Sequence, residues 1–201
     1  IMMMEMQEYI SLVNTSLLLF VILIYRIYSC LCQTQNNDIS LSLPKKNVKT
    51  MVFFGSGGHT MEMIRLIKHL SPEKYHPICF GIGHTDITSI EKVRSANLLL
   101  EQNASWLRIY RNREVKQSWI TTIFTSMWSF IQSFWVIHRY RPELLICNGP
   151  GTCLSLCYSA FILNVLGITG RTKIIFVESF CRVNALSLTG KLIMPIANKF
   201  I

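Results

Sequence analysis

The segment from residue 55 to residue 60 reads GSGGHT and directly follows an apolar run typical of a buried strand. Glycine lets the backbone turn sharply and approach a ligand closely, and the N–H groups at the start of a following helix attract anions. We therefore expect this loop to bind a phosphate or a diphosphate. His59 is the side chain of the loop that is suited to proton transfer near neutral pH, although a histidine here can also cap or pack against the helix.

A second glycine-rich segment, NGPGT from residue 148 to residue 152, also lies between a strand-like run and a helical pattern. Two such loops at neighbouring strand ends can hold one extended diphosphate, but helix starts are often built this way for structural reasons alone. The first loop is not a dinucleotide-binding fingerprint, because Thr60 stands where the third glycine belongs and no carboxylate ends the second strand. It also lacks the lysine of a P-loop. These departures disfavour a nucleotide-dependent oxidoreductase.

Charged side chains accompany two further strand ends. Four cations lie within nine residues, offset by Glu114 alone: Arg108, Arg111, Arg113 and Lys116. Such a run is usually a solvated basic face, and beside a glycine loop it can also neutralise phosphate. Glu178 follows the fifth apolar run, where it can bind sugar hydroxyls, act as a base or pair with Arg182. The chain holds 20 Lys and Arg against 11 Asp and Glu, so an anionic partner is expected.

Short apolar runs alternate with helical patterns along the body of the chain, and these elements must position the residues above. The predicted strands cover residues 48–54, 76–82, 106–110, 143–147 and 173–177. The predicted helices cover residues 60–70, 86–94, 118–140, 152–166 and 186–198, and a sixth strand starts at residue 199. This alternation predicts an α/β fold with one Rossmann-like, doubly wound parallel sheet. Ligands bind such a sheet at the carboxyl ends of its strands, where both glycine loops, the basic run and Glu178 are expected.

The apolar excess is greatest near the N-terminus. Residues 10–32 are long and apolar enough for a transmembrane helix in which Arg26 snorkels to the headgroups. Glu5 and Glu8 precede this span, whereas basic residues follow it at Lys45, Lys46 and Lys49. The positive-inside rule then predicts a single-pass protein with residues 1–9 in the lumen, a linker at 33–47 and a cytosolic domain at 48–201. A cleaved signal peptide is disfavoured, because the preceding segment is acidic and no small-residue cleavage site follows.

A second apolar stretch, at residues 118–140, is rich in large side chains: Trp119, Phe124, Met127, Trp128, Phe130, Phe134 and Trp135. A helix of this composition with cations at its ends can lie at a membrane interface. Core burial is the competing account, and we expect it to explain at least half of these residues. Nucleic-acid binding is disfavoured, because the aromatics share one apolar helix rather than an exposed sheet face. The seven cysteines lack metal-ligand spacing and predict neither a metal site nor a disulfide framework.

Four stretches together resemble a known family: GSGGHTMEMIRLI from Gly55, RNREVKQSW from Arg111, ELLICNGPGTC from Glu143 and FVESFCRVNALSLTGKL from Phe176. With the anchor, they are similar to the membrane-anchoring, acceptor-side subunit of the two-chain N-acetylglucosaminyltransferase that adds the second sugar of the dolichol-linked oligosaccharide. A more distant likeness is to the N-terminal half of the bacterial peptidoglycan N-acetylglucosaminyltransferase, a two-domain GT-B enzyme. The resemblance covers nearly the whole chain.

The resemblance implies half of a split, inverting GT-B glycosyltransferase of the endoplasmic reticulum membrane that forms a β-1,4 linkage. A small soluble catalytic partner would bind the donor, UDP-N-acetylglucosamine, so no cofactor and no metal are implied for this chain. Its other implied partners are the dolichol-diphosphate-linked acceptor, the membrane and the preceding N-acetylglucosamine-phosphate transferase, with no nucleic acid. The acceptor diphosphate would be bound by Gly55, Ser56, Gly57, Gly58, Thr60, Asn148, Gly149, Gly151, Thr152, Arg111 and Arg113.

His59 and Glu178 are, in that order, the catalytic residues that the resemblance implies. The alternative function is a membrane-tethered scaffold that recruits a partner without contributing to the active site, and a scaffold predicts that the glycine loops tolerate substitution. The chain begins with Ile1 and stops where the sixth strand starts, whereas the family continues with a tail that docks the catalytic partner. We therefore expect a truncation at the C-terminus.

Overall fold

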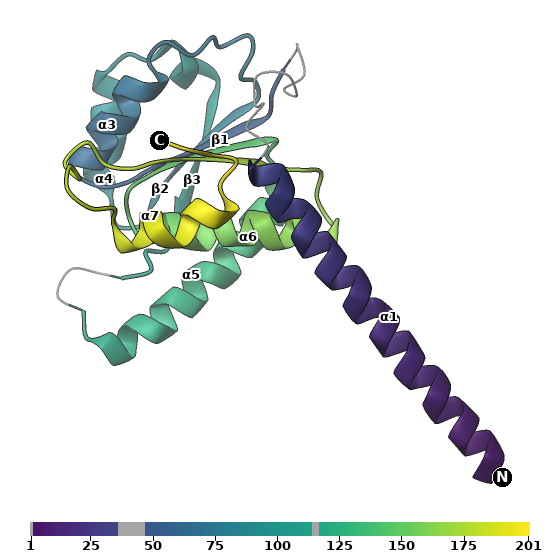
Figure 1. Ribbon diagram of the computed structural model, residues 1–201. Helices are drawn as coiled ribbons and strands as arrows, with labels where there is room; N and C mark the ends of the chain where they lie inside the picture. Colours follow the sequence, from purple (N-terminus) through teal and green to yellow (C-terminus); the bar gives the residue numbers. More distant parts are fainter. Residues whose placement is uncertain (1, 36–46, 114–116) are drawn as a thin grey trace.

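The computed structural model describes residues 2–35, 47–113 and 117–201, and in these residues six strands form one sheet (Figure 1). The strand order is β3-β2-β1-β4-β5-β6, and every neighbouring pair is parallel. This is the predicted doubly wound α/β fold. The strands are β1 (Thr50–Phe54), β2 (Ile78–Gly83), β3 (Ala104–Ile109), β4 (Leu144–Asn148), β5 (Lys173–Val177) and β6 (Lys199–Phe200).

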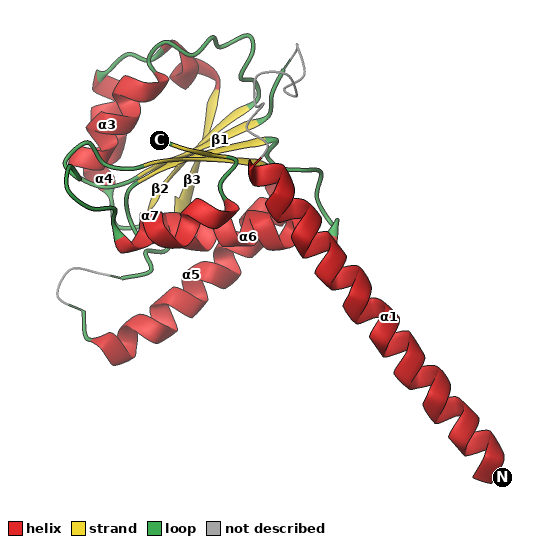
Figure 2. Cartoon of the chain, in the orientation of Figure 1, coloured by secondary structure: helices red, strands yellow, loops and turns green. Residues whose placement is uncertain are grey.

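Helices cover both faces of the sheet (Figure 2). On one face lie α3 (Gly58–Ile67) and α4 (Ile87–Ser95), and on the other lie α5 (Trp119–Tyr140), α6 (Thr152–Leu166) and α7 (Leu188–Ile193). Two short 3₁₀ helices, η1 (Leu99–Asn103) and η2 (Met194–Ile196), complete the body. The predicted helix at 186–198 is thus wrong in extent, because Pro195 ends the α-helix by removing a backbone donor.

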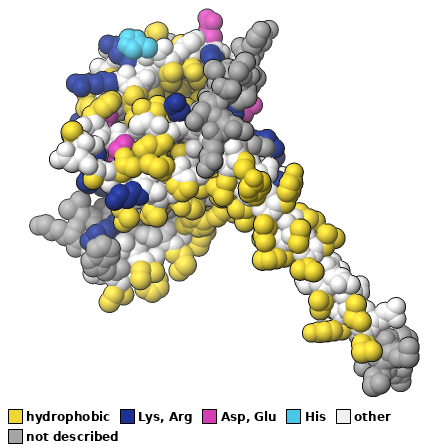
Figure 3. Space-filling view, in the orientation of Figure 1, with side chains coloured by type: hydrophobic (Ala, Val, Ile, Leu, Met, Phe, Trp, Pro, Cys, Tyr) yellow, Lys and Arg dark blue, Asp and Glu magenta, His cyan; other side chains and the backbone are white. Residues whose placement is uncertain are grey.

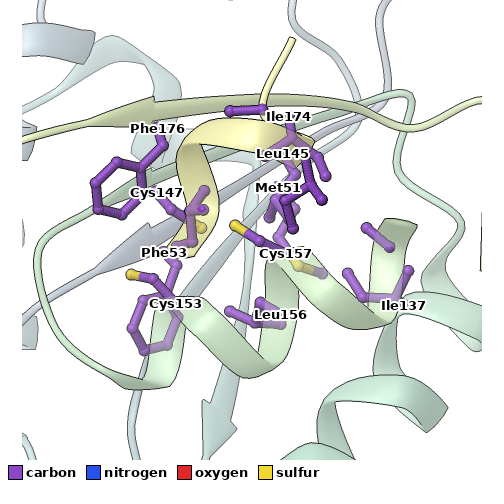
Figure 4. Close-up of a cluster of buried hydrophobic side chains, with 14 of the residues drawn as sticks. Met51, Phe53, Ile137, Leu145, Cys147, Cys153, Leu156, Cys157, Ile174 and Phe176 are labelled. Carbon is purple, nitrogen blue, oxygen red and sulfur yellow. The ribbon is translucent and has the colours of Figure 1, made fainter. Parts of the chain in front are cut away.

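The central strand β1 is apolar at nearly every position, without the alternation of a half-exposed strand. All five residues of β1 are buried, since both faces of the sheet are covered. Met51 and Phe53 pack into a cluster with α5, α6 and α7, part of which is shown in Figure 4. Val52 and Phe54 point to the opposite face and pack with α3. One hydrophobic core therefore lies on each face of the sheet, and together they fix the positions of the strand ends.

The cysteines of the larger cluster are core residues. Cys147, Cys153 and Cys157 are fully buried. Burial raises the pKa of the Cys147 and Cys157 thiols well above the ordinary value, which keeps them uncharged and unreactive. These side chains fill apolar volume beneath the sheet.

The topology brings the ends of β1 and β4 together. From β1 the chain moves outward through β2 and β3, and it then returns to β4 on the other side of β1. Phe53 of β1 pairs with Cys147 of β4, so the loops that leave these two strands start side by side. A doubly wound sheet binds its ligands at this reversal of strand order. Both glycine loops leave the sheet there.

Helix α1 (Met2–Gln35) stands away from the sheet for most of its length (Figure 1). The stretch Met6–Cys32 has a mean hydropathy of 2.0 and is not buried by the rest of the protein, so it is long and apolar enough to cross a membrane. This stretch contains the predicted span at 10–32. The helix continues to Gln35, into the predicted linker, while residues 36–46 lie outside the described residues.

Arg26 binds the body of the protein, a contact that the sequence did not predict. Its guanidinium donates to the main-chain oxygens of Val165 and, at 3.2 Å, Asn164 at the end of α6. The last carbonyls of a helix lack partners within the helix, and the absent side chain of Gly167 leaves room for the guanidinium. Further along α1, the Thr34 hydroxyl bonds a carbonyl of η2 at 3.4 Å. The C-terminal part of α1 is therefore hydrogen-bonded to α6 and η2.

The two faces of α5 differ in an unexpected way. Ser129 and Ser133 are buried with Val136 and Ile137, and the Ser129 hydroxyl donates to the Tyr110 carbonyl at 2.7 Å. The exposed face carries Ile120, Ile123, Phe124, Met127, Trp128, Ile131 and Trp135. Four of the seven large side chains noted in the sequence are therefore exposed, and the expectation that the core buries at least half of them is wrong. Hydrophobic side chains gather over α5 and α1 on the same side of the sheet (Figure 3).

Candidate functional site

The two predicted glycine loops pack closely against each other at the ends of β1 and β4. A Cβ atom at Gly55 would lie 2.5 Å from Cδ of Pro150, and one at Gly149 would lie 2.3 Å from Nδ1 of His59. Gly149 also has a φ of 89°, which residues with a side chain rarely adopt. These two glycines are required for the loops to pack against each other.

The other three loop glycines border open space. No atom of the described residues lies within 4 Å of a Cβ built at Gly57 or Gly58, and at Gly151 the nearest atom is 4.0 Å away. Helices α3 and α6 start here without a side-chain cap, whereas α4, α5 and α7 are capped by Asp86, Ser118 and Ser187. The first N–H groups of α3 are therefore suited to bind an anion. At α6 the N–H groups of Cys153 and Leu154 already donate to the carbonyls of Pro150 and Gly151, at 2.9 and 3.0 Å.

An open pocket of about 170 Å³ lies beside these helix starts. Its lining joins predicted site residues from three loops: Gly55, Ser56, Gly151, Thr152, Arg111 and Arg113. Asp86, which the sequence did not single out, also lines it. Its carboxylate lies 3.5 Å from Nη2 of Arg111 and accepts a hydrogen bond from the Ser89 N–H at 3.1 Å. The carboxylate thus orients Arg111 at the pocket and offsets part of its charge.

Asn112 fixes the basic loop against the helices. Its carbonyl accepts hydrogen bonds from the hydroxyls of Thr125 and Ser126 on α5, at 2.8 and 3.1 Å. Its side-chain oxygen accepts from Ser155 of α6 at 2.9 Å, and its N–H donates to Thr152 at 3.3 Å. The two neighbouring arginines are held at the pocket by this residue. Lys116 and Glu114 lie outside the described residues.

His59 belongs to a hydrogen-bonded network beside the pocket. Its Nδ1 lies 2.9 Å from Oδ1 of Asn148 and 3.4 Å from a carboxylate oxygen of Glu62. The same Glu62 oxygen accepts from Nδ2 of Asn148 at 3.1 Å, and its other oxygen accepts from the Ser179 hydroxyl at 2.8 Å. His59 keeps 32% of its side chain exposed. A partly exposed imidazole whose other side is hydrogen-bonded to a buried side chain, here Asn148, is suited to proton transfer.

The hydrogen bonds of this network favour the ionised form of the Glu62 carboxyl. Burial raises its pKa, but the hydrogen bonds from Ser179, from Asn148 and from His59, together with the charge of a protonated imidazole, lower it by more. Glu62 was not predicted as a site residue. The available signal was its spacing, because residues three apart on a helix share a face and Glu62 is three residues from His59.

Three predicted site residues lie behind the loops. Thr60 is fully buried, and its hydroxyl bonds the Gly55 carbonyl at 2.6 Å and the Ser89 hydroxyl at 2.7 Å. Asn148 is fully buried and faces His59 and Glu62. Glu178 is 9% exposed, and its carboxylate accepts from the N–H of Ser179 and from both the N–H and the hydroxyl of Ser187. These side chains are engaged within the protein and shape the site from inside.

One cation near the first loop was also missed. Nζ of Lys92, on α4, donates to the Gly57 carbonyl at 3.4 Å. The sequence placed Lys92 in a polar surface helix with no link to a loop 35 residues away. This lysine adds positive charge beside the start of α3.

The chain is similar to proteins of oligosaccharide biosynthesis. Residues 50–201 match the family described as oligosaccharide biosynthesis protein Alg14 like. The rat and human proteins named UDP-N-acetylglucosamine transferase subunit ALG14 are each 42% identical over 166 residues, which cover 79% of this chain and 76% of theirs. The Schizosaccharomyces pombe protein of the same name is 41% identical over 155 residues, covering 75% of this chain and 73% of its own.

A solved structure has a similar fold. The crystal structure of Acinetobacter baumannii MurG matches with a TM-score of 0.54 and 13% sequence identity. The match covers 77% of this chain but 40% of the MurG chain. This chain thus has the fold of about two fifths of that protein.

Proposed function

The chain belongs to the Alg14 family, and we propose that it is the membrane-anchoring, acceptor-binding subunit of a two-chain UDP-N-acetylglucosamine transferase. In this proposal the complex adds the second N-acetylglucosamine, in β-1,4 linkage, to N-acetylglucosaminyl-diphosphodolichol on the cytosolic face of the endoplasmic reticulum. The names of the relatives support a role as transferase subunit. The apolar helix α1 is compatible with membrane anchoring.

The observation that carries the proposal is the uncapped start of α3 together with the basic loop at the pocket. The first N–H groups of α3 and the two arginines of the basic loop provide donors and positive charge near one space. A diphosphate carries the charge and the acceptor oxygens that such a set binds. We propose that the backbone at Gly57, Gly58 and Gly151, with Ser56, Thr152, Arg111 and Arg113, binds the acceptor diphosphate. Gly55, Thr60, Asn148 and Gly149 then hold the loops in shape.

His59 is the proposed general base. As the acceptor sugar's hydroxyl attacks C1 of the donor N-acetylglucosamine, the imidazole takes the hydroxyl proton and UDP departs from C1 with its bonding electrons. Attack from the side opposite UDP inverts the configuration at C1. We propose a role for Glu178 in holding the β5–α7 segment at the site, since its oxygens bond Ser179 and Ser187.

The donor site and the partner complete the proposal. A soluble catalytic subunit binds UDP-N-acetylglucosamine and closes over the carboxyl edge of the sheet, and this chain alone is inactive. The chain itself uses no cofactor, and the preceding N-acetylglucosamine-phosphate transferase is a further proposed partner. The exposed apolar face of α5 rests on the membrane surface from which the lipid acceptor extends.

The test is sugar transfer from UDP-N-acetylglucosamine to a lipid-diphosphate acceptor by the co-expressed complex. We expect His59→Ala to lower kcat by about 10²- to 10⁴-fold, the usual contribution of a general base. His69→Ala, at an exposed histidine beyond the end of α3, is the matched control and should leave kcat unchanged. Full activity of His59→Ala would remove His59 from the catalytic step. If substitutions at Gly58 and Gly151 were also tolerated, the scaffold alternative would stand instead.

A further inference from the structure

The amide of Asn148 has one orientation that satisfies both of its neighbours. Its Nδ2 donates to the Glu62 carboxylate, so its Oδ1 faces Nδ1 of His59 at 2.9 Å. The reversed amide would place Oδ1 against the carboxylate, with no proton between two acceptors. A carboxylate at position 62 therefore fixes the direction of the amide, because an ionised carboxylate can only accept.

The direction of the amide determines which nitrogen of His59 carries the proton. Oδ1 of Asn148 is an acceptor, and the Glu62 oxygen 3.4 Å away from Nδ1 is an acceptor as well. Nδ1 must therefore be the protonated nitrogen of the neutral ring. The lone pair of the ring is then on Nε2, on the opposite side from this network.

We infer that Glu62 is a positioning residue that holds His59, directly and through Asn148, in the tautomer whose Nε2 accepts the proton of the acceptor hydroxyl. This inference rests on the proposed function, in which His59 is the base. In the transfer step the hydroxyl oxygen bonds C1 of the donor sugar, the bond from C1 to the UDP oxygen breaks with its electron pair going to UDP, and the proton moves to Nε2. Ser179 holds Glu62 in turn and links the segment after β5 to the base.

The first experiment separates positioning from folding by steady-state kinetics of the complete two-chain complex. Glu62→Gln keeps the shape of the side chain but lets position 62 donate, so the Asn148 amide can reverse and Nδ1 can lose its proton. We expect kcat to fall about 10- to 100-fold, with little change in KM for the lipid acceptor. Glu91→Gln, at an exposed glutamate on α4, is the matched control and should leave both constants unchanged.

The second experiment reads the tautomer of His59 directly. The complex, with this chain labelled by ¹⁵N-histidine, is examined by NMR at a pH where the ring is neutral, and His59→Gln identifies the signal. We expect a protonated Nδ1 in the wild type and a changed tautomer ratio in Glu62→Gln. A wild-type ring protonated on Nε2 overturns the inference, and this measurement decides even if Glu62→Gln is poorly folded.

The two proposals fail in different ways. An active His59→Ala complex would overturn the role of His59 as base, and the role of Glu62 with it. An inactive His59→Ala complex beside a fully active Glu62→Gln complex with an unchanged tautomer would overturn the role of Glu62 alone.

Discussion

The five glycines of the two loops have two different physical roles. Gly55 and Gly149 are required because a side chain would collide with Pro150 or His59 across the contact between the loops. Gly57, Gly58 and Gly151 border open space, where a missing side chain leaves room for a ligand near the backbone, and Gly57 also has a φ of 69° that favours glycine. A sequence shows the same letter at all five positions, so this division follows only from the structure.

Two glycine substitutions should separate stability from activity. Gly149→Ala should destabilise the chain by about 1–3 kcal/mol, because of its positive φ and the collision with His59, and should also abolish transfer. Gly58→Ala should leave stability within about 1 kcal/mol of the wild type, since the site is open and helical, but should raise KM for the acceptor. Thermal unfolding and transfer assays of both variants provide the measurement. An unchanged melting temperature in Gly149→Ala would contradict this assignment.

The part of the site that the sequence predicts is formed by residues that are close together along the chain. His59 and the glycine loops could be found because strand, loop and helix start are consecutive in the sequence. Spacing places Glu62 on the same helix face as His59, but its network could not be predicted, because its other partners Asn148 and Ser179 are 86 and 117 residues away. The same reason explains why the contact of Arg26 was not predicted, since no local pattern shows that it binds the end of α6.

At the scale of elements, α5 shows the limit of reading a helix by composition. Its order among the strands was predictable, but apolar residues surround the helix and give no clear inner face. Between residues 120 and 135 the buried positions are the small residues Ser129 and Ser133, and the Ser129 hydroxyl bonds the carbonyl of Tyr110 directly after β3, while the large side chains of the exposed face point outward. Side-chain size rather than polarity distinguishes the buried face from the exposed face in this part of the helix.

A charge on the exposed face of α5 should weaken its contact with the membrane. Phe124→Glu should lower transfer to a long-chain lipid acceptor in liposomes by about tenfold, because burying a side chain of this size stabilises by about 1.5–3 kcal/mol. The melting temperature should stay unchanged, since most of the Phe124 side chain is exposed and does not pack against the rest of the protein. Ile87→Glu, at an exposed position on α4 on the other face of the sheet, is the matched control. Equal transfer by the two variants would argue against a membrane contact of α5.

At the scale of the whole molecule, α1 and the body form one unit. α1 continues as a helix from its apolar stretch to its contacts with α6 and η2, and these contacts set its direction relative to the body. The exposed face of α5 and the helix α1 extend on the same side of the sheet (Figure 3). A membrane crossed by α1 would therefore also lie close to α5.

Removing the contact between Arg26 and α6 should lower transfer to long, membrane-embedded acceptors more than transfer to short, water-soluble ones. Arg26→Leu removes two charged hydrogen bonds, and we expect a loss of stability of about 1–3 kcal/mol. Transfer to a membrane-embedded acceptor should fall, because the body is no longer held at a fixed tilt, while transfer to a short, water-soluble acceptor should change little. Arg65→Leu, at an exposed arginine on α3, provides the control. Equal losses with the two acceptors would show that Arg26 acts on stability alone.

The contact between Arg26 and α6 also has a consequence for biosynthesis. Its two sides are separated by 138 residues, and chains grow at about 5–20 residues per second. The interval between the synthesis of Arg26 and that of its partner is therefore on the order of 10 s. During this interval α1 has been made but the end of α6 has not. The contact that fixes the direction of α1 relative to the body therefore forms only after the first four strands and α6 have been synthesised.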